Sequence, residues 1–121
     1  MSDLAAVATA SVLEAHLRLR EAGKLERDIA ENYAEHVVLL THEGVYRGAA
    51  GVRHAAAVLA RHVADSNYEY LKKHVADDYA YLEWRARGRN GGECHGWDAF
   101  VIREGRIVAQ MIYFACTPGA R

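Results

Sequence analysis

The sequence predicts an α+β fold, in which a curved, mostly antiparallel sheet wraps about three N-terminal helices to form a cone. Three observations predict it. Apolar residues recur every three or four positions through the first half of the chain, which is typical of amphipathic helices. From about residue 68 the spacing changes to two, which is typical of strands. The length of 121 residues suits one hydrophobic core, so we predict a single domain over residues 1–121.

The first half of the chain predicts three helices. Good helix formers fill residues 4–22 and stop at Gly23. One stripe of this helix, at spacings of three and four, comprises Val12, Leu13, His16, Leu17 and Arg20. A second short helix is expected over residues 24–33, where every fourth residue is apolar. A third is expected from Ala49 to the polar turn at residues 65–67.

One strand precedes the third helix and four follow it. The β-branched and apolar residues 37–41 predict the first strand, and residues 43–48 then favour a loop. The later strands are expected at residues 68–76, 79–87, 94–103 and 106–116. Because only short connections separate them, successive strands are predicted to pair antiparallel.

Both faces of the last two strands are largely apolar, but the helices can cover only one of them. We therefore predict a homodimer in which a second copy covers the outer face, with Trp97, Met111 and Tyr113 as anchors. The alternative is that the C-terminal tail or the first strand folds over this face.

Composition narrows the class of partner. The 15 basic and 16 acidic side chains nearly cancel, so we expect no nucleic-acid partner and no binding to a membrane. No signal peptide or long apolar run is recognisable, and a cytoplasmic location is expected. Cys94 and Cys116 are far apart in sequence and belong to no metal or redox motif. We expect both to be reduced and structural.

Asp98 is the first candidate catalytic residue. Strand alternation places it on the same face as Phe100 and Ile102, where ionisation is costly. Such a carboxyl either has a raised pKa and serves as an acid, a base or a hydrogen-bond donor, or is a core carboxylate with a buried donor partner.

His16 is the second candidate, because it interrupts the apolar stripe of the first helix. A lone inward histidine is more often a hydrogen-bonded core residue, although a position facing Asp98 across a pocket would favour catalysis. Gln110 is predicted to lie on the same sheet face as Asp98, where it could simply satisfy a polar neighbour. The residues expected to bind a ligand are Tyr33, Thr41, Leu82, Trp84, Phe100, Gln110, Ile112 and Phe114.

The sequence contains no motif for metal binding, covalent serine catalysis or phosphate binding. The remaining histidines form no metal-ligand spacing, so no metal is expected. No serine lies in a nucleophile elbow, and no glycine-rich phosphate loop precedes a lysine. We expect no cofactor.

Two stretches resemble a known family. Residues 81–88 and 96–107 are similar to the last strands of the SnoaL-like and ketosteroid-isomerase-like families, which belong to the nuclear-transport-factor-2-like superfamily. Residues 21–25 and Tyr46-Arg-Gly48 resemble the first half of the same families. The resemblance spans nearly the whole chain and implies a cystatin-like α+β barrel.

The resemblance also implies roles for individual residues. Asp98 matches the aspartate that donates an oxyanion-hole hydrogen bond in the isomerases and acts as acid or base in the cyclases. His16 falls at the oxyanion-hole tyrosine of the isomerases. Thr41 falls at their general-base aspartate, a departure because threonine is no base at neutral pH. His42 is adjacent but is expected to point to the opposite face.

Three functions are compatible with these residues. The first is an isomerase or cyclase in which Asp98, supported by His16, performs acid/base chemistry on a small apolar carbonyl compound. The second is a non-catalytic binding or dimerisation module, which a pocket filled by Trp84, Phe100 and Phe114 would favour. The third is an epoxide-hydrolase-like site, which requires a second inward carboxylate and an arginine.

Overall fold

The computed structural model describes residues 3–64 and 68–119, and it has the predicted α+β fold. The helices are α1 (Asp3–Glu21), α2 (Leu25–Asn32) and α3 (Gly48–His62). The strands are β1 (Tyr33–Thr41), β2 (Gly44–Arg47), β3 (Glu69–Ala76), β4 (Tyr79–Arg87), β5 (Glu93–Arg103) and β6 (Arg106–Cys116).

The element boundaries agree with the sequence except around the first strand. β1 begins at Tyr33, four residues earlier than expected. The predicted loop over residues 43–48 is wrong, because β2 lies there and pairs antiparallel with β1. Val45 and Tyr46 do alternate between the two faces of the sheet, but the run is too short to predict a strand. The predicted end of the third helix at residues 65–67 lies outside the described residues.

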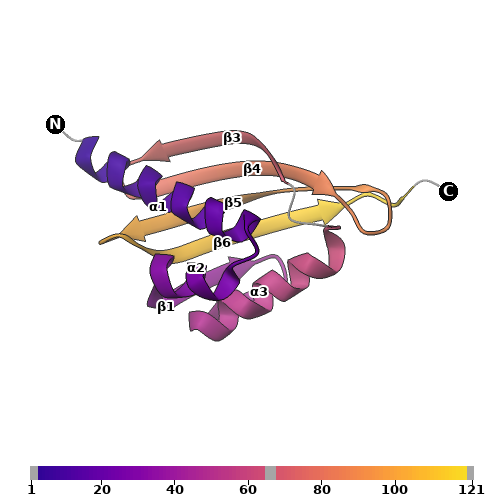
Figure 1. Ribbon diagram of the computed structural model, residues 1–121, viewed down its shortest axis with the longest axis horizontal. Helices are drawn as coiled ribbons and strands as arrows, with labels where there is room; N and C mark the ends of the chain where they lie inside the picture. Colours follow the sequence, from indigo (N-terminus) through magenta and orange to yellow (C-terminus); the bar gives the residue numbers. More distant parts are fainter. Residues whose placement is uncertain (1–2, 65–67, 120–121) are drawn as a thin grey trace.

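The six strands form one curved, open sheet in the order β2-β1-β6-β5-β4-β3. The prediction that the last four strands pair antiparallel in succession is confirmed: β3 pairs with β4, β4 with β5 and β5 with β6. β6 then returns beside β1 and pairs with it in parallel. Figure 1 shows the three helices on one side of this sheet, with α1 across β3, β4 and β5 and with α3 beside β1 and β2.

The inward stripe of α1 packs on the sheet as its spacing predicts. Leu13, His16 and Leu17 are all buried. Thr9 ties the N-terminal half of α1 to the sheet, because its hydroxyl donates a hydrogen bond of 2.6 Å to the backbone carbonyl of Asp77 in the β3–β4 turn. The helix therefore presents His16 to the concave face of the sheet.

The expectation of reduced cysteines is wrong: Cys94 and Cys116 form a disulfide. They are opposite each other on β5 and β6. The register of this hairpin shifts by one residue between Val101 and Ile102, and this bulge brings position 94 opposite position 116. Without it, Cys94 would face Ala115.

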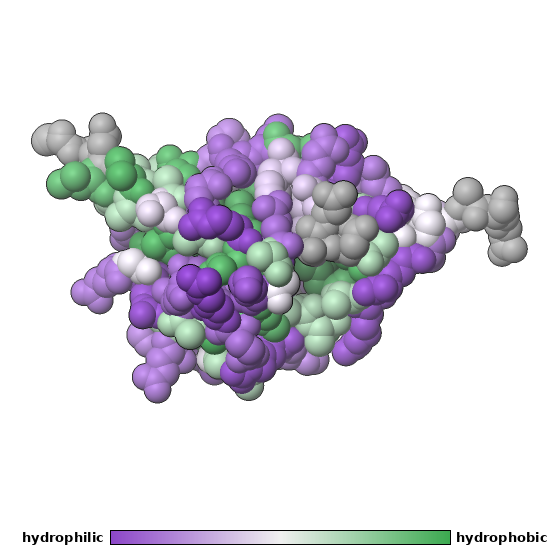
Figure 2. Space-filling view, viewed as in Figure 1, coloured by the Kyte–Doolittle hydropathy of each residue, from purple (hydrophilic) through white to green (hydrophobic). Residues whose placement is uncertain are grey.

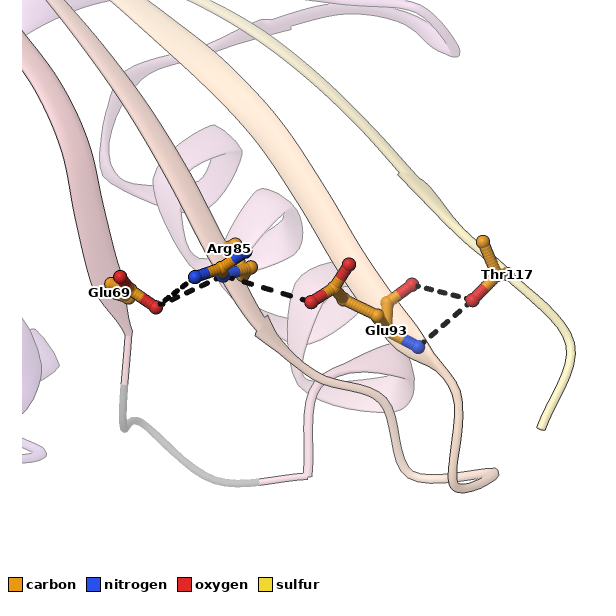
Figure 3. A network of polar contacts seen from close by, with 4 residues as sticks. All are labelled: Glu69, Arg85, Glu93 and Thr117. Carbon is orange, nitrogen blue, oxygen red and sulfur yellow. Dashed lines mark hydrogen bonds and ion pairs between the residues drawn. The ribbon is translucent and has the colours of Figure 1, made fainter. Parts of the chain in front are cut away.

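A polar network ties the strands together at this end of the sheet (Figure 3). The Arg85 guanidinium lies between the carboxylates of Glu69, at 2.7 Å, and Glu93, at 3.7 Å. The Thr117 hydroxyl accepts a 3.0 Å hydrogen bond from the Glu93 amide and donates one of 3.2 Å to the Glu93 carbonyl. These contacts and the disulfide hold β3, β4, β5 and the segment after β6 in place.

The outer face of the sheet carries a row of rings on four neighbouring strands. His74, Tyr81, Trp97 and Tyr113 stack in sequence, with centroid separations of 6.0, 6.5 and 6.2 Å. Trp97 is 38% exposed and Tyr113 is 42% exposed. The homodimer through this face stays a prediction.

The helical side of the molecule faces the viewer in Figure 2, and most of it is polar. Apolar surface gathers at the N-terminal end of α1, where Leu4 and Val7 are exposed. Within the described ranges, no helix is both long and apolar enough to cross a membrane.

Candidate active site

A pocket lies between the helices and the concave face of the sheet. Its walls come from α1, α3, all six strands, the β1–β2 turn and the segment entering β3. Counted out to its open mouth, it encloses about 890 Å³, so this volume is an upper bound on what a ligand can fill. The lining is mostly apolar, with a few polar groups at its inner end, as is usual for small-molecule sites.

Asp98 stands on β5 between Leu82 and Ile112, its register partners on β4 and β6. Its Oδ1 accepts a 3.0 Å hydrogen bond from the indole of Trp84, and its Oδ2 accepts a 2.8 Å bond from the amide nitrogen of Gln110. Burial raises the pKa of the Asp98 carboxyl above its ordinary value of 3.8, although both hydrogen bonds oppose that rise. Asp98 therefore keeps its proton to a higher pH than a solvated aspartate.

Tyr33 and Gln110 continue this network behind Asp98. The buried Tyr33 hydroxyl donates a 2.5 Å hydrogen bond to Gln110 Oε1. Burial, and then the negative charge of Asp28, raises the pKa of Tyr33, so its hydroxyl stays protonated. Because the Tyr33 proton occupies the amide oxygen, Gln110 must turn its NH₂ group to Asp98. The orientation of the Gln110 amide is thus fixed.

His16 belongs to a second polar cluster. Its Nδ1 lies 2.7 Å from Oδ2 of Asp28, which is fully buried on α2. Oδ1 of Asp28 accepts a 2.8 Å hydrogen bond from Asn32. We assign the imidazole hydrogen to Nδ1, because a carboxylate oxygen that faces it can only accept.

The other imidazole nitrogen of His16, Nε2, is open to the pocket. No hydrogen bond to it is found among the described residues, and in the same part of the chain no buried side-chain nitrogen or oxygen lacks a partner. Nε2 is therefore reached by solvent, and His16 lines the pocket. The ring is held by edge contacts with Tyr33 and Phe100, at centroid separations of 5.7 and 5.5 Å.

The position of the His42 side chain, at the mouth of the pocket, differs from the prediction. We expected its side chain on the opposite face, but β1 ends at Thr41 and His42 lies in the following turn, where it lines the pocket. Its ring contacts Tyr113 and Phe114 edge-on. The Thr41 hydroxyl is occupied in the same turn, where it accepts hydrogen bonds from the Glu43 and Gly44 amides. Thr41 thus lines the pocket without offering a base.

The structure brings together nine of the ten residues selected from the sequence. The residues on the pocket wall are His16, Tyr33, Thr41, Leu82, Trp84, Asp98, Gln110, Ile112 and Phe114. Phe100 is the exception: it is 1% exposed and lies in the core behind His16.

Sequence reasoning missed Asp28 and Asn32, the two residues that orient His16. A signal for both was present. Leu25, Asp28, Ile29 and Asn32 fall on one face of α2 by their spacing of three and four, so both polar residues were on the buried side. For metals, no group of three or more histidine, cysteine, aspartate or glutamate side chains in residues 3–64 and 68–119 could hold an ion.

Three helices packed on one face of a curved six-stranded sheet form an NTF2-like fold. The sequence model of the SnoaL-like domain matches residues 13–110. The chain therefore belongs to the SnoaL-like domain family.

Solved structures show the same fold at low sequence identity. An NTF2-like protein of unknown function from Mesorhizobium loti is 20% identical, with a TM-score of 0.78 over 95% of this chain and 97% of the other. A candidate ketosteroid isomerase from Kribbella flavida is 10% identical, with a TM-score of 0.76 over 96% and 84%. A candidate polyketide cyclase from Sinorhizobium meliloti is 21% identical, with a TM-score of 0.68 over 84% and 93%. A comparison of the sequence with curated proteins found no match.

Proposed function

We propose that this protein is an acid/base enzyme, an isomerase or cyclase, that acts on a small apolar compound with a carbonyl group. The observation that supports the proposal most directly is that two different polar side chains, those of Asp98 and His16, line one apolar pocket. Asp98 has a raised pKa, and His16 is held by a buried carboxylate with one nitrogen free. Titratable groups in distinct environments at one site favour separate acid and base roles.

His16 is the proposed base. Asp28 fixes the hydrogen on Nδ1, so the lone pair of Nε2 is available to take a proton from the carbon beside the substrate carbonyl. Asp28 stabilises the imidazolium that then forms, as a buried carboxylate does for other catalytic histidines. This assignment supplies the base that Thr41 cannot.

Asp98 is the proposed partner of the carbonyl oxygen. In its protonated form it donates a hydrogen bond, or its proton, to the oxygen that gains negative charge when the carbon is deprotonated. Trp84 and Gln110 hold the carboxyl in place from the other side. Delivery of the proton from His16 to a different carbon of the conjugated enolate, with any proton on the oxygen returning to Asp98, completes an isomerisation. Attack of the enolate carbon on a second carbonyl of the same substrate, with the His16 proton passing to the new alkoxide, would complete an aldol-type cyclisation.

Two alternatives are less well supported. A binding module would be favoured by a pocket filled with aromatic side chains, but Trp84 and Phe114 form walls, and Phe100 lies outside the lining. An epoxide-hydrolase-like site needs two inward carboxylates and an arginine. Arg20 does line the pocket, but the second carboxylate, Asp28, is sealed behind His16.

The test is proton exchange at carbon, which needs no knowledge of the natural substrate. Apolar ketones such as 2-tetralone are incubated with the protein in D₂O, and loss of the α-proton signal is followed by NMR. The wild type is expected to accelerate exchange over buffer. Asp98→Asn and His16→Gln are each expected to lower the rate by about 10²- to 10⁴-fold, the usual range for general acid/base groups.

Matched controls separate chemistry from stability. Asp78→Asn changes a partly exposed aspartate that pairs with Arg103, and His74→Gln changes an exposed histidine on the outer face. Both are expected to keep the wild-type exchange rate. Binding of the ketones without any acceleration of exchange would instead favour the non-catalytic binding module.

We also propose that the protein acts as a homodimer. The partly exposed Trp97 and Tyr113 on the outer sheet face support the dimer, since isolated proteins rarely leave such rings uncovered. Sedimentation of the wild type and of Trp97→Lys tests this. A wild-type monomer would contradict the proposal.

A further inference from the structure

Arg20 lies in the pocket, but its role is unassigned. It follows His16 by one helical turn on the inward stripe of α1 and is half-buried. No hydrogen bond or ion pair to its guanidinium is formed by residues 3–64 or 68–119. Other arginines without such a partner, Arg18 and Arg61 among them, are exposed to solvent. Arg20 is therefore a permanent positive charge without a partner inside an apolar pocket.

The anionic groups around Arg20 leave its charge unmatched. Its charge lowers the pKa of Asp98, but the two form no ion pair within 4.0 Å. Asp28 is already bonded to His16 and Asn32. Glu21, the next residue of α1, shares a side-chain hydrogen bond with Tyr70. Burial, and then the negative charge of Glu21, raises the pKa of Tyr70, which keeps that hydroxyl neutral. An anionic group on a ligand would supply the charge partner that these residues do not.

We propose that Arg20 binds a carboxylate of the substrate, so that the natural substrate is an apolar carbonyl compound that also carries an acid group. This inference rests on the proposed function, because it names the substrate class of the same site. A guanidinium offers two parallel N–H donors that match the two oxygens of a carboxylate. Neighbouring positions on a helix face are about 5–6 Å apart at Cβ, so the carboxylate lies only a few bonds from the carbon that His16 deprotonates.

The test compares two probes of the same shape and different charge, 2-naphthoate and 2-naphthamide. Their affinities for the whole chain are measured by calorimetry and by ligand-observed NMR. The wild type is expected to bind 2-naphthoate about tenfold more tightly than the amide, the ratio that one charge-assisted hydrogen-bond pair supplies. Arg20→Gln is expected to abolish that ratio and to leave the affinity for the amide unchanged.

Arg18→Gln is the matched control, because Arg18 is an exposed arginine on the same helix. It is expected to keep the tenfold ratio. If Arg20→Gln does not fold, Arg20→Lys serves in its place and is expected to reduce the ratio, because lysine keeps the charge but loses the paired donors.

Equal affinity of the wild type for both probes, or a preference for the acid that survives in the Arg20 variants, overturns the inference. So does failure of both probes to bind. The proton-exchange assay uses a neutral ketone and the wild-type chain, so its outcome is separate from the preference for the acid probe. Equal binding of the two probes by a wild type that still accelerates exchange would remove this inference alone, whereas a wild type that does not accelerate exchange would remove the proposed function.

Discussion

Replacing Asp28 by asparagine tests how far one buried carboxylate governs the site. Asp28 is fully buried and makes two short hydrogen bonds, of 2.7 Å to His16 and 2.8 Å to Asn32. Asparagine keeps the volume but puts a neutral oxygen and an NH₂ group in place of two charged oxygens, so both hydrogen bonds lose their charge assistance and the group facing His16 can become a donor. A hydrogen bond to a charged group contributes about 1.5–3 kcal/mol, so we expect Asp28→Asn to lower the free energy of unfolding by about 2 kcal/mol.

The same substitution is expected to change the tautomer of His16. With Nδ1 no longer facing a carboxylate, the hydrogen is free to move to Nε2, which would then point its N–H into the pocket. Chemical denaturation gives the stability, and long-range ¹H–¹⁵N correlation of the imidazole gives the tautomer. Glu31→Gln is the control, since Glu31 is an exposed acid on the same helix whose pair with Arg27 is expected to contribute about 0.5 kcal/mol or less.

Two results would refute this reasoning. One is a loss of stability in Asp28→Asn no larger than in Glu31→Gln. The other is an unchanged His16 tautomer, which would mean that Asp28 does not orient the ring. In either case His16 would lose its status as a prepared base.

Three further predictions concern the frame of the pocket. Reducing the Cys94–Cys116 disulfide, which spans 22 positions, is expected to lower the free energy of unfolding by about 3 kcal/mol; unchanged denaturation after complete reduction would contradict this. Because burial raises the pKa of Asp98, the folded protein binds its proton more tightly than the unfolded chain does. Wild-type stability relative to Asp98→Asn should therefore fall as pH rises from the ordinary value of 3.8 through the raised one, and a constant difference from acid to neutral pH would speak against it. Gly96→Ala places a Cβ 2.9 Å from Cζ2 of Trp84 and against the backbone of β6, so it should cost about 1–3 kcal/mol and alter tryptophan fluorescence; a variant with the stability and spectrum of the wild type would disprove the clash.

Most of the fold could be predicted from the local spacing of apolar residues. The change from helical spacing to alternation is a property of neighbouring residues, so the helices and the four-strand meander could be predicted from the sequence. The inward positions of Asp98 and Gln110 followed from the same alternation. Such predictions succeed where the residues of a single helix or strand are enough to show which of its faces is buried.

Features that depend on distant contacts could not be predicted in this way. Asp28 and His16 meet because α1 and α2 pack together, and no spacing rule connects residues on two different helices. The disulfide depends on a one-residue bulge near Val101, which alternation does not reveal. Both examples concern the site or its frame, where polar contacts between elements matter more than periodicity.

The most direct test of the central claim is the ¹³C signal of 2-tetralone labelled at its carbonyl carbon and bound to the protein. If the carbonyl oxygen accepts a hydrogen bond from Asp98, the bound resonance should move downfield of the free ketone, and Asp98→Asn should reduce that shift while Asp78→Asn retains it. A bound ketone whose carbonyl resonance stays at the free value, or moves equally in Asp98→Asn, would contradict the account.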